Sequence, residues 1–206
     1  GVLTEIHPQS VSMVALDGYR LAVSTEKMNS GQENHFIISA KIINEISKII
    51  AEDGDAEEVE IYLGKKKATF RIDTTEIVLR LMEGEYIKYR DIMPTQSTTD
   101  IVIGRAILQE SIERASLLAR EGKNNLIKMT IKNNLLTITS RSEEGNVKEE
   151  DLEIGFNSKF VIDVLKVIDD DEISMHFLTG TSPCMVKPVS GDAYEYLILP
   201  VRIPTM

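Results

Sequence analysis

Hydrophobic residues recur with helical spacing in three stretches of the chain. In the first and third stretches the apolar residues fall on one face of a helix, and a polar residue suited to an N-cap precedes each face. In the second stretch the apolar face consists of Ile107, Leu108, Ile112, Ala115 and Leu118, and Gly122 follows as a helix-ending residue. We predict amphipathic helices at Ser39–Ile50, Ala106–Arg120 and Asn157–Ile168.

Most of the other apolar residues lie in short runs with the pattern of β-strands. Turn-forming residues separate many of these runs, as at Asn133-Asn134, Gly64 and Ser190-Gly191-Asp192. The predicted strands are residues 2–6, 11–16, 59–63, 67–71, 76–82, 126–131, 135–140, 173–178, 184–188 and 194–199. The pattern predicts an α+β fold with mainly antiparallel sheets and few helices.

The first and third predicted helices match each other at an offset of 118 residues. The cap, the apolar face and the polar face all recur: Ser39 matches Asn157, Lys41 matches Lys159, Ile42 matches Phe160, Glu45 matches Asp163, Ile46 matches Val164 and Lys48 matches Lys166. Upstream, at an offset of 125 residues, Ile6, Val11 and Met13 match Ile131, Leu136 and Ile138 around a short turn. These matches indicate an internal repeat of about 120 residues.

The repeat divides the chain into two domains, which we expect at residues 1–98 and 99–206. The boundary falls near Pro94 to Thr99, where Pro, Thr, Gln and Ser interrupt the apolar pattern. The second copy has a helix before its strand pair, whereas the first copy begins at the strand pair. Because the chain also begins with Gly1, we expect a fragment whose first domain lacks its opening.

Composition fits a soluble globular protein and limits its partners. Of the 206 residues, 42% are hydrophobic and 27% are charged, and 23 basic against 33 acidic residues give a net charge of −10. On bulk charge alone, tight capture of nucleic acid or of an anionic membrane is disfavoured, although local arrangement can offset the sum. The single cysteine and the lack of a signal segment or long apolar run favour a cytoplasmic protein.

The chain shows few signs of catalytic chemistry. His7, His35 and His176 lack neighbours at metal-ligand spacing, and no phosphate-binding loop or nucleophile motif is present. The acidic clusters Asp53–Asp55 and Asp169–Glu172 fit solvated turns better than a metal site, and Cys184 fits a buried thiol better than a nucleophile. We therefore expect a binding protein without catalytic residues, metal or cofactor. A small metal-dependent enzyme using the acidic clusters is the alternative.

Two pairs of lysines occupy equivalent positions of the repeat. Lys41 and Lys48 lie two turns apart on the polar face of the first helix, and Lys159 and Lys166 repeat this spacing. The plainest interpretation is a solvated polar face, on which Lys41 pairs with Glu45 and Lys159 pairs with Asp163 at i, i+4 spacing. Recurrence favours a cationic surface, which would hold DNA by its phosphates without reading bases.

Two further segments stand out. Leu16 to Leu21 reads as a strand, an Asp-Gly turn and a return strand, which a β-hairpin alone explains. Tyr196 to Ile203 is an apolar strand in which Pro200 should free an edge, or else a core strand with a frayed end.

Six segments together resemble the bacterial DNA polymerase III beta subunit family, the sliding clamps. They are DGYRLAV, FIISAKIINEISKII, RLMEGEYIKYRDIMP, ERASLLAREGKNN, DLEIGFNSKFVIDVL and YLILPVRIP, in the family's order and across essentially the whole chain. The resemblance implies the DNA clamp fold, with tandem helix-backed antiparallel β-sheet domains. The chain would hold most of the middle domain and the C-terminal domain of a three-domain subunit.

The resemblance also implies a function. Two full-length subunits of this family close head to tail into a ring around duplex DNA, helices inward, and act as a non-catalytic processivity factor of the replicative polymerase. Partner peptides from the polymerase catalytic subunit, clamp loader, mismatch repair proteins and ligase bind a groove between the middle and C-terminal domains. No membrane partner is implied.

The family's functional positions map onto residues of this chain. The implied peptide groove comprises Leu16, Gly18, Tyr19, Arg20, Leu21, Asn157, Phe160, Pro183, Leu197, Leu199, Pro200, Val201, Arg202 and Ile203. The implied DNA-facing residues are Lys41, Lys48, Arg114, Lys159 and Lys166. Leu117 and Leu118, with the acidic segment 143–151, match the subunit interface.

The chain departs from the family pattern at two groove positions and at its end. Ile87 and Asp91 stand where the family often has Pro and Arg, and Pro204, Thr205 and Met206 extend past Ile203. Asp91 would weaken or change the binding of acidic motifs, and the added residues would crowd the groove. A β-rich scaffold unrelated to DNA is the remaining alternative.

Overall fold

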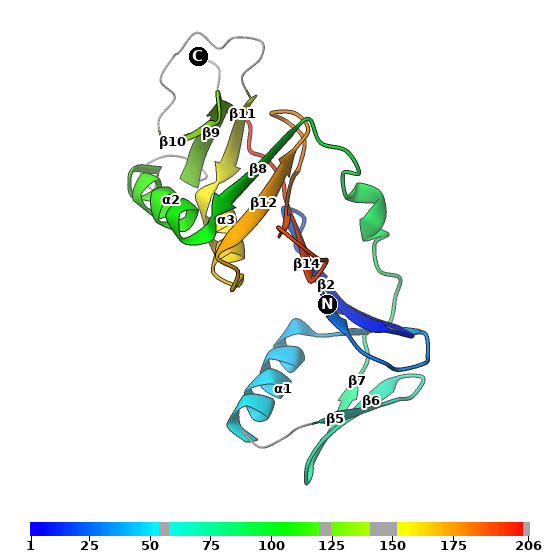
Figure 1. Ribbon diagram of the computed structural model, residues 1–206. Helices are drawn as coiled ribbons and strands as arrows, with labels where there is room; N and C mark the ends of the chain where they lie inside the picture. Colours follow the sequence, from blue (N-terminus) through cyan, green and yellow to red (C-terminus); the bar gives the residue numbers. More distant parts are fainter. Residues whose placement is uncertain (54–57, 120–124, 141–151, 204–206) are drawn as a thin grey trace. The chain divides into compact units, whose positions relative to one another are not determined.

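The computed structural model describes residues 1–53, 58–119, 125–140 and 152–203. Packing divides the chain into two units, one of Gly1–Ala15 with Val23–Lys88 and one of Leu16–Ala22 with Tyr89–Met206. Both units combine helices with antiparallel sheets, which confirms the α+β class (Figure 1). The predicted division between residues 98 and 99 stays a prediction. The end of the acidic cluster at Asp55, the helix end at Arg120 with Gly122, the segment 143–151 and the tail 204–206 lie outside the described residues.

The first unit contains two groups of strands and one helix. One group has the order β4-β1-β2-β3 and the other is the meander β5-β6-β7. The elements are β1 (Val2–His7), β2 (Ser10–Leu16), β3 (Arg20–Lys27), β4 (Asn34–Ile38), α1 (Ala40–Asp53), β5 (Val59–Leu63), β6 (Lys67–Ile72) and β7 (Thr75–Arg80). The end of β2 and the start of β3 belong to the second unit.

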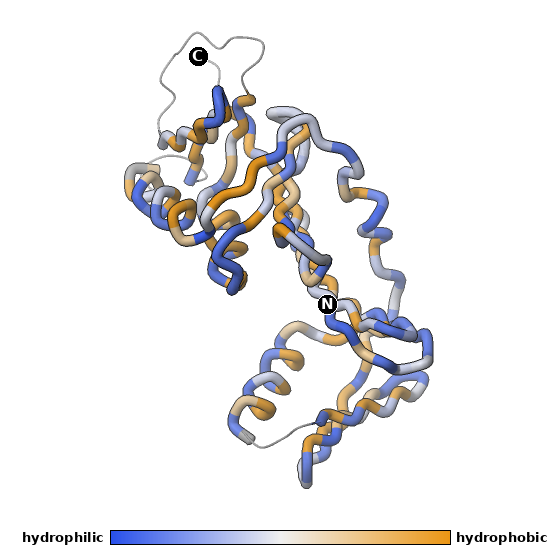
Figure 2. Tube along the Cα trace, viewed as in Figure 1, coloured by the Kyte–Doolittle hydropathy of each residue, from blue (hydrophilic) through white to orange (hydrophobic). Residues whose placement is uncertain are grey.

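Helix α1 forms where the sequence pattern predicts it. The carbonyl of Ser39 accepts the N–H groups of Ile42 and Ile43, so the helix is closed from its first turn. Its apolar side packs on the meander, with Ile46 in one buried cluster with Phe70 and Leu79. Figure 1 shows α1 beside this sheet, and Figure 2 shows apolar residues gathered along the helix.

The second unit places two helices against two sheets. Its sheets have the orders β10-β9-β11 and β14-β13-β12-β8. The elements are a 3-10 helix (Tyr89–Ile92), β8 (Thr99–Gly104), α2 (Arg105–Ala119), β9 (Leu126–Lys132), β10 (Leu135–Thr139), β11 (Leu152–Asn157), α3 (Ser158–Leu165), β12 (Glu172–Phe177), β13 (Cys184–Pro188) and β14 (Tyr194–Ile198). One core joins them, in which Ile112 of α2, Leu165 of α3 and Phe156 of β11 are all buried.

The internal repeat is confirmed by strand register. In the first unit Ile6 pairs with Val11 across the β1–β2 hairpin, and in the second Ile131 pairs with Leu136 across β9–β10. The strand before the helix pairs with the first strand in both copies: Val2 pairs with Ile38, and Ile127 pairs with Phe156. Each copy thus has a hairpin, a strand that returns beside its first strand, a helix and a three-strand meander, and the first copy has the additional strand β3.

Several elements differ from their predicted extents. The strands β4, β8 and β11 were not predicted, because each runs into a helix or its cap within one or two residues and lacks a turn signal on that side. Helix α3 ends at Leu165 rather than Ile168, since Val167 donates to Val164 in the tighter i to i+3 pattern. In the described part of the chain, no helix is long and apolar enough to span a bilayer.

The buried aromatic ring of Phe156 generates a stability prediction. Phe156 is 0% exposed in the core of the second unit, so Phe156→Ala should lower the free energy of unfolding by about 3–5 kcal/mol. Val102, on the same unit but 59% exposed, is the matched control, and Val102→Ala should change it by less than about 0.5 kcal/mol. Urea unfolding followed by circular dichroism measures both; a similar loss in the two variants would contradict this core.

Candidate functional site

The turn between β2 and β3 is held by its own aspartate. Oδ1 of Asp17 accepts the N–H groups of Tyr19 and Arg20 at 3.0 and 3.1 Å, and the Asp17 N–H donates to the Arg20 carbonyl. Gly18 has φ +85°, a conformation that favours glycine. The Asp-Gly pair therefore fixes the turn and leaves the two side chains that follow it in defined positions.

Arg20 joins this turn to helix α3. Its Nε donates to Oδ2 of Asp17 at 3.0 Å, and its Nη1 donates to Oδ2 of Asp163 at 2.7 Å. The guanidinium carbon also lies 4.8 Å from the centre of the Phe160 ring, within the range of a cation–π contact. Tyr19 stacks on the same ring, with centroids 5.6 Å apart.

The charges in this cluster stabilise one another. Partial burial alone would raise the pKa of Asp17, but hydrogen bonds from the backbone of Tyr19 and from Arg20 outweigh it and lower that pKa. Burial opposes the charge of Arg20 in the same way, and its bonds to Asp163 and Asp17 raise its pKa. Asp17 and Arg20 are therefore both charged near neutral pH.

The C-terminal run lies against the turn and against β11. The N–H of Leu199 donates to the Tyr19 carbonyl at 2.9 Å, and the N–H of Val201 donates to the Gly155 carbonyl at 2.8 Å. Gly155 has no side chain, and a Cβ there would approach the Val201 carbonyl oxygen to 2.5 Å. The close approach of the run to β11 thus requires glycine at position 155.

The structure brings most of the implied groove residues into one unit and one neighbourhood. Asn157 caps α3 by accepting the N–H of Lys159 at 3.0 Å, as predicted, which places Phe160 on the first turn of the helix. Tyr19 is 62% exposed, whereas Leu21 and Leu197 are buried and belong to the core rather than to the exposed surface. The half-buried members are Leu16, Arg20, Asn157, Phe160, Leu199, Pro200, Val201 and Ile203, and the exposed ones are Gly18 and Arg202.

Pro183, also an implied groove residue, lines a separate pocket that contains none of the other implied groove residues. With Pro94, Ser97 and His176 it lines a small pocket of about 90 Å³ beside β12 and β13. The Nδ1–H of His176 there donates to Oδ1 of Asp100 at 2.8 Å, and Nε2 lies 3.1 Å from the Ser174 hydroxyl. Ser174 also lies 3.1 Å from the Lys187 carbonyl, so this set ties neighbouring strands together.

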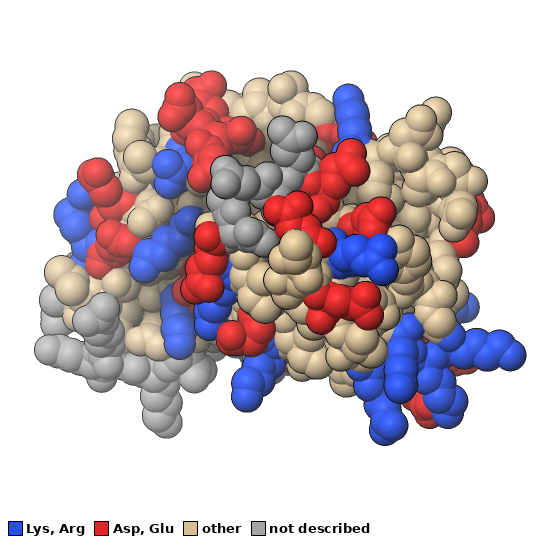
Figure 3. Space-filling view, turned by 90° about the horizontal axis from the view of Figure 1, so that it is seen from below, with Lys and Arg blue, Asp and Glu red and all other residues tan. Residues whose placement is uncertain are grey.

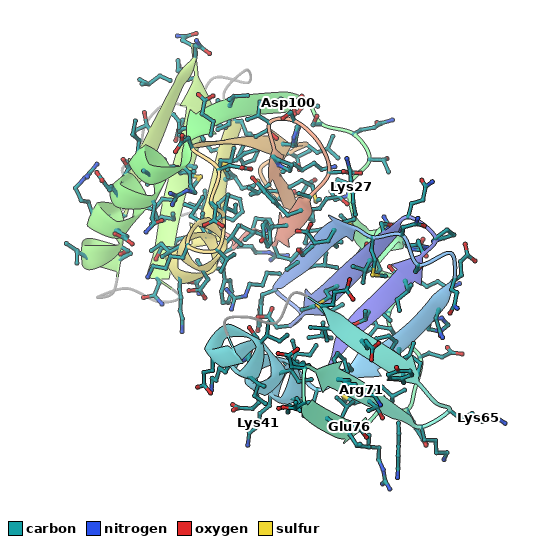
Figure 4. The ribbon with its side chains drawn as sticks, turned by 60° about the horizontal axis from the view of Figure 1, so that its bottom comes forward. Lys27, Lys41, Lys65, Arg71, Glu76 and Asp100 are labelled. Atoms are coloured by element: carbon teal, nitrogen blue, oxygen red, sulfur yellow. The ribbon has the colours of Figure 1, made fainter. Side chains whose placement is uncertain are left out.

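The lysines matched by the repeat are exposed on α1 and α3. Lys41 and Lys48 belong to the first unit, and Lys159 and Lys166 to the second. Figure 4 shows Lys41 projecting from α1, and Figure 3 shows basic side chains interspersed with acidic ones on the face in view. Lys159 and Lys166 line a hollow of about 490 Å³ with Asp163 and with Glu113 of α2.

Two ion pairs differ from those expected on the helices. Glu45 pairs with Lys48 at 2.9 Å and not with Lys41, and Asp163 pairs with Arg20 and not with Lys159. The i, i+3 spacing brings Lys48 within reach of Glu45 as readily as i, i+4 does. The Asp163 partner comes from 143 residues away, which no local pattern reveals. Arg114 on α2 lies 3.6 Å from Glu110.

An apolar surface lies along α2 and the edge strand β10. Leu117 is 62% exposed but lines the hollow of Lys159 and Lys166 instead, and the side chain of Leu118 lies outside the described set. Ile107, predicted on the buried face of the helix, is instead 69% exposed, because it points to a hollow of about 670 Å³ rather than into the core. Leu136 and Ile138 of β10 line the same hollow. Sequence periodicity could not distinguish this open hollow from a filled core.

The other candidates for chemistry stay isolated in the described residues. Cys184 is buried, and burial raises the pKa of its thiol well above the ordinary range. Among the described residues, no three His, Cys, Asp or Glu side chains are grouped to hold a metal ion.

Comparison with known proteins identifies relatives of both units. Residues 1–88 match the family model of the DNA polymerase III beta subunit central domain, and residues 90–202 match that of its C-terminal domain. The beta sliding clamp of Staphylococcus epidermidis is 36% identical over 98% of this chain, and that of Staphylococcus aureus is 34% identical. The chain spans 56% of the length of these relatives.

Solved structures agree with the sequence matches. The DNA polymerase III beta subunit of Thermotoga maritima has a TM-score of 0.89 and 31% identity over 99% of this chain and 57% of its own. The beta chain from Streptococcus pneumoniae has a TM-score of 0.88 and 28% identity over 98% of this chain and 57% of its own. The DNA clamp fold expected from the sequence is therefore confirmed.

Gly155 generates a prediction for the C-terminal run. In Gly155→Ala the new Cβ would clash with the Val201 carbonyl oxygen, so the run should move away and the Val201–Gly155 hydrogen bond should weaken. We expect a loss of about 1–3 kcal/mol in the free energy of unfolding and faster hydrogen exchange at Val201. Gly104→Ala is the matched control, because its Cβ would meet nothing closer than 3.6 Å. Unchanged exchange at Val201 would refute the close approach.

Proposed function

Because the chain belongs to the DNA polymerase III beta subunit family, we propose that it forms part of a sliding clamp, the ring-shaped processivity factor of a replicative DNA polymerase. Residues 1–98 would supply most of the middle domain and residues 99–206 the C-terminal domain. The chain covers 56% of the S. epidermidis relative, so the activity is proposed for the whole subunit. It would be an accessory protein without a catalytic role.

The observation that carries the proposal is the meeting of the Asp17–Arg20 turn, the start of α3 and the C-terminal run. These segments lie far apart in the sequence, yet Leu199 bonds to Tyr19 and Tyr19 stacks on Phe160. The result is an exposed aromatic ring and an arginine beside half-buried aliphatic side chains. Such a surface suits short peptides with aliphatic and aromatic side chains. We assign to it the peptide motifs of the polymerase catalytic subunit, clamp loader, mismatch repair proteins and ligase.

The exposed lysines of α1 and α3 would face duplex DNA. An acidic chain of net charge −10 does not capture DNA by bulk attraction. A closed ring needs no such capture, because the DNA is retained by topology. Weak, sequence-independent contacts from Lys41, Lys48, Arg114, Lys159 and Lys166 then allow sliding.

The apolar surface along α2 and β10 would be the subunit interface. Ile107 and, among the described strands, the edge of β10 leave apolar area and strand hydrogen-bonding groups available to another chain, and the exposed Leu117 lies farther along the same helix. We propose that a full-length subunit pairs head to tail through this surface to form a cytoplasmic homodimer.

The departures from the family pattern lie at the surface. Ile87 is 56% exposed and Asp91 is exposed on the 3-10 helix, where the neighbouring Ile92 is 50% exposed. An acidic side chain at 91 would repel acidic partner motifs, so we propose that this clamp prefers peptides with few carboxylates.

A peptide titration tests the proposed groove. We expect N-acetyl-Gln-Leu-Ser-Leu-Phe-amide to bind the wild-type chain, and Leu199→Ala to weaken binding about five- to fiftyfold, because an apolar contact of this size is worth about 1–2.5 kcal/mol. Fluorescence anisotropy of a labelled peptide measures the Kd. Val102→Ala, on the exposed outer strand β8, should leave the Kd unchanged.

The outcome separates the remaining alternatives. No binding of the peptide by the wild-type chain would favour a scaffold unrelated to DNA. A hydrolytic activity that depends on divalent metal and vanishes with chelator would favour an enzyme. Equal Kd values for wild type and Leu199→Ala would refute the assignment of the C-terminal run.

Charge reversal tests the DNA-facing helices. In a chimera in which this sequence replaces the matching part of the S. epidermidis clamp, changing Lys41, Lys48, Lys159 and Lys166 to Glu should cut retention on nicked circular DNA by at least about tenfold, because four phosphate contacts become repulsive. Peptide affinity should change less than about twofold. Reversal of Lys27, Lys65, Lys66 and Lys67, which lie outside the helices, is the matched control (Figure 4). Equal loss of DNA retention in the two sets would contradict the assignment.

A further inference from the structure

Arg20 is held by two carboxylates that come from different parts of the chain. Asp17 belongs to the same turn, so its bond to Nε could form in the isolated hairpin. Asp163 lies on α3, 143 residues away, and its bond to Nη1 at 2.7 Å is the shorter of the two. Charge-assisted bonds of this length are the stronger class of hydrogen bond. Asp163 therefore fixes the direction of the guanidinium relative to the helix.

The helix also supplies the surface on which the guanidinium rests. Phe160 precedes Asp163 by three residues, so both side chains lie on one face of α3. The guanidinium carbon lies 4.8 Å from the Phe160 ring centre while Nη1 reaches Asp163. Phe160 thus contacts the guanidinium of Arg20 with its ring, and Asp163 binds Nη1. Without Asp163, Arg20 would keep the bond to Asp17, but its guanidinium would no longer be fixed relative to α3.

Arg20 keeps hydrogen-bonding capacity for a ligand. Its side chain is 30% exposed, and a guanidinium has more N–H groups than its two bonded nitrogens use here. Within the described part of the chain, the other Nη carries no hydrogen bond. An anchored donor of this kind suits an acceptor oxygen of a bound peptide, and it binds more tightly than a mobile one because less freedom is lost.

Asp163 has no other ion-pair partner in the described part of the chain. It lines the same hollow as Lys159 and Lys166, yet its carboxylate pairs with Arg20 at 2.7 Å. The carboxylate of Asp163 is therefore bound at the turn, and Glu113 of α2 is a second carboxylate beside the two lysines.

We propose that Asp163 is a positioning residue of the peptide site, acting through Arg20. Its carboxylate holds the guanidinium over the Phe160 ring, with the other Nη group available to an acceptor oxygen of the peptide. This inference rests on the proposed function, since it names a residue that organises the same groove without touching the peptide. Asp163 is not among the groove residues expected from the sequence.

A double-mutant cycle on peptide affinity tests the proposal. With N-acetyl-Gln-Leu-Ser-Leu-Phe-amide as the probe, Asp163→Asn should raise the Kd about two- to fivefold, in keeping with the modest strength of a partly exposed ion pair. In the Arg20→Ala background, Asp163→Asn should add no further loss, because its route of action is gone. Asp169→Asn, an exposed carboxylate beyond the end of α3, is the matched control and should leave the Kd unchanged.

A spectroscopic measurement separates positioning from support of the helix. In wild type the Arg20 Nη1 protons, which bond to Asp163, should give a resolved, slowly exchanging signal in ¹⁵N NMR, and in Asp163→Asn that signal should shift and exchange faster, while the Nε–H bonded to Asp17 should change less. If Asp163 only stabilised α3, Asp163→Asn would raise the Kd of the peptide by the same factor in the wild-type and Arg20→Ala backgrounds. Either that result or an unchanged Arg20 signal would overturn the proposal.

The two levels of inference fail differently. If the wild-type chain does not bind the probe, the proposed peptide groove fails and the Arg20 signal alone decides whether Asp163 positions it. If wild type binds and Asp163→Asn binds equally well, the groove stands and the role of Asp163 is refuted.

Discussion

The candidate site depends on one guanidinium that joins the turn after β2 to helix α3. Arg20 bonds to its own turn through Asp17, to α3 through Asp163, and to the aromatic surface through Phe160. The backbone completes the arrangement, because Leu199 donates to the Tyr19 carbonyl and Val201 donates to the Gly155 carbonyl. A surface made of a turn, a helix and the run of residues 199–203 needs such cross-links to hold the three segments in one arrangement.

Much of the fold follows from local pattern. The apolar periodicity of α1 and α3, the Asn157 cap and the turn residues between strands each predicted an element that the structure contains. The matched positions of the repeat predicted equivalent hairpins, and the registers of β1–β2 and β9–β10 agree residue for residue. These features could be predicted because each depends on neighbouring residues or recurs at matched positions of the repeat.

The candidate site could be predicted only in part. The hairpin and the C-terminal run stood out as motifs, and their resemblance to a known family placed them in one groove. The pairing of Asp163 with Arg20 could not be predicted from the sequence, because Lys159 lies only four residues away at helical spacing and is the expected partner. The exposure of Ile107 was also hidden, since an apolar residue on a helix has the same periodicity whether it faces a filled core or an open hollow.

The link between residues 20 and 163 has an evolutionary consequence. The guanidinium of Arg20 lies over an aromatic ring while Asp163 binds its Nη1, and loss of the arginine would leave Asp163 without its ion-pair partner. Substitutions at the two positions should therefore be correlated among homologues, as expected for residues in direct contact. A neutral pair at both positions would mark lineages whose binding partners use a different anchoring group.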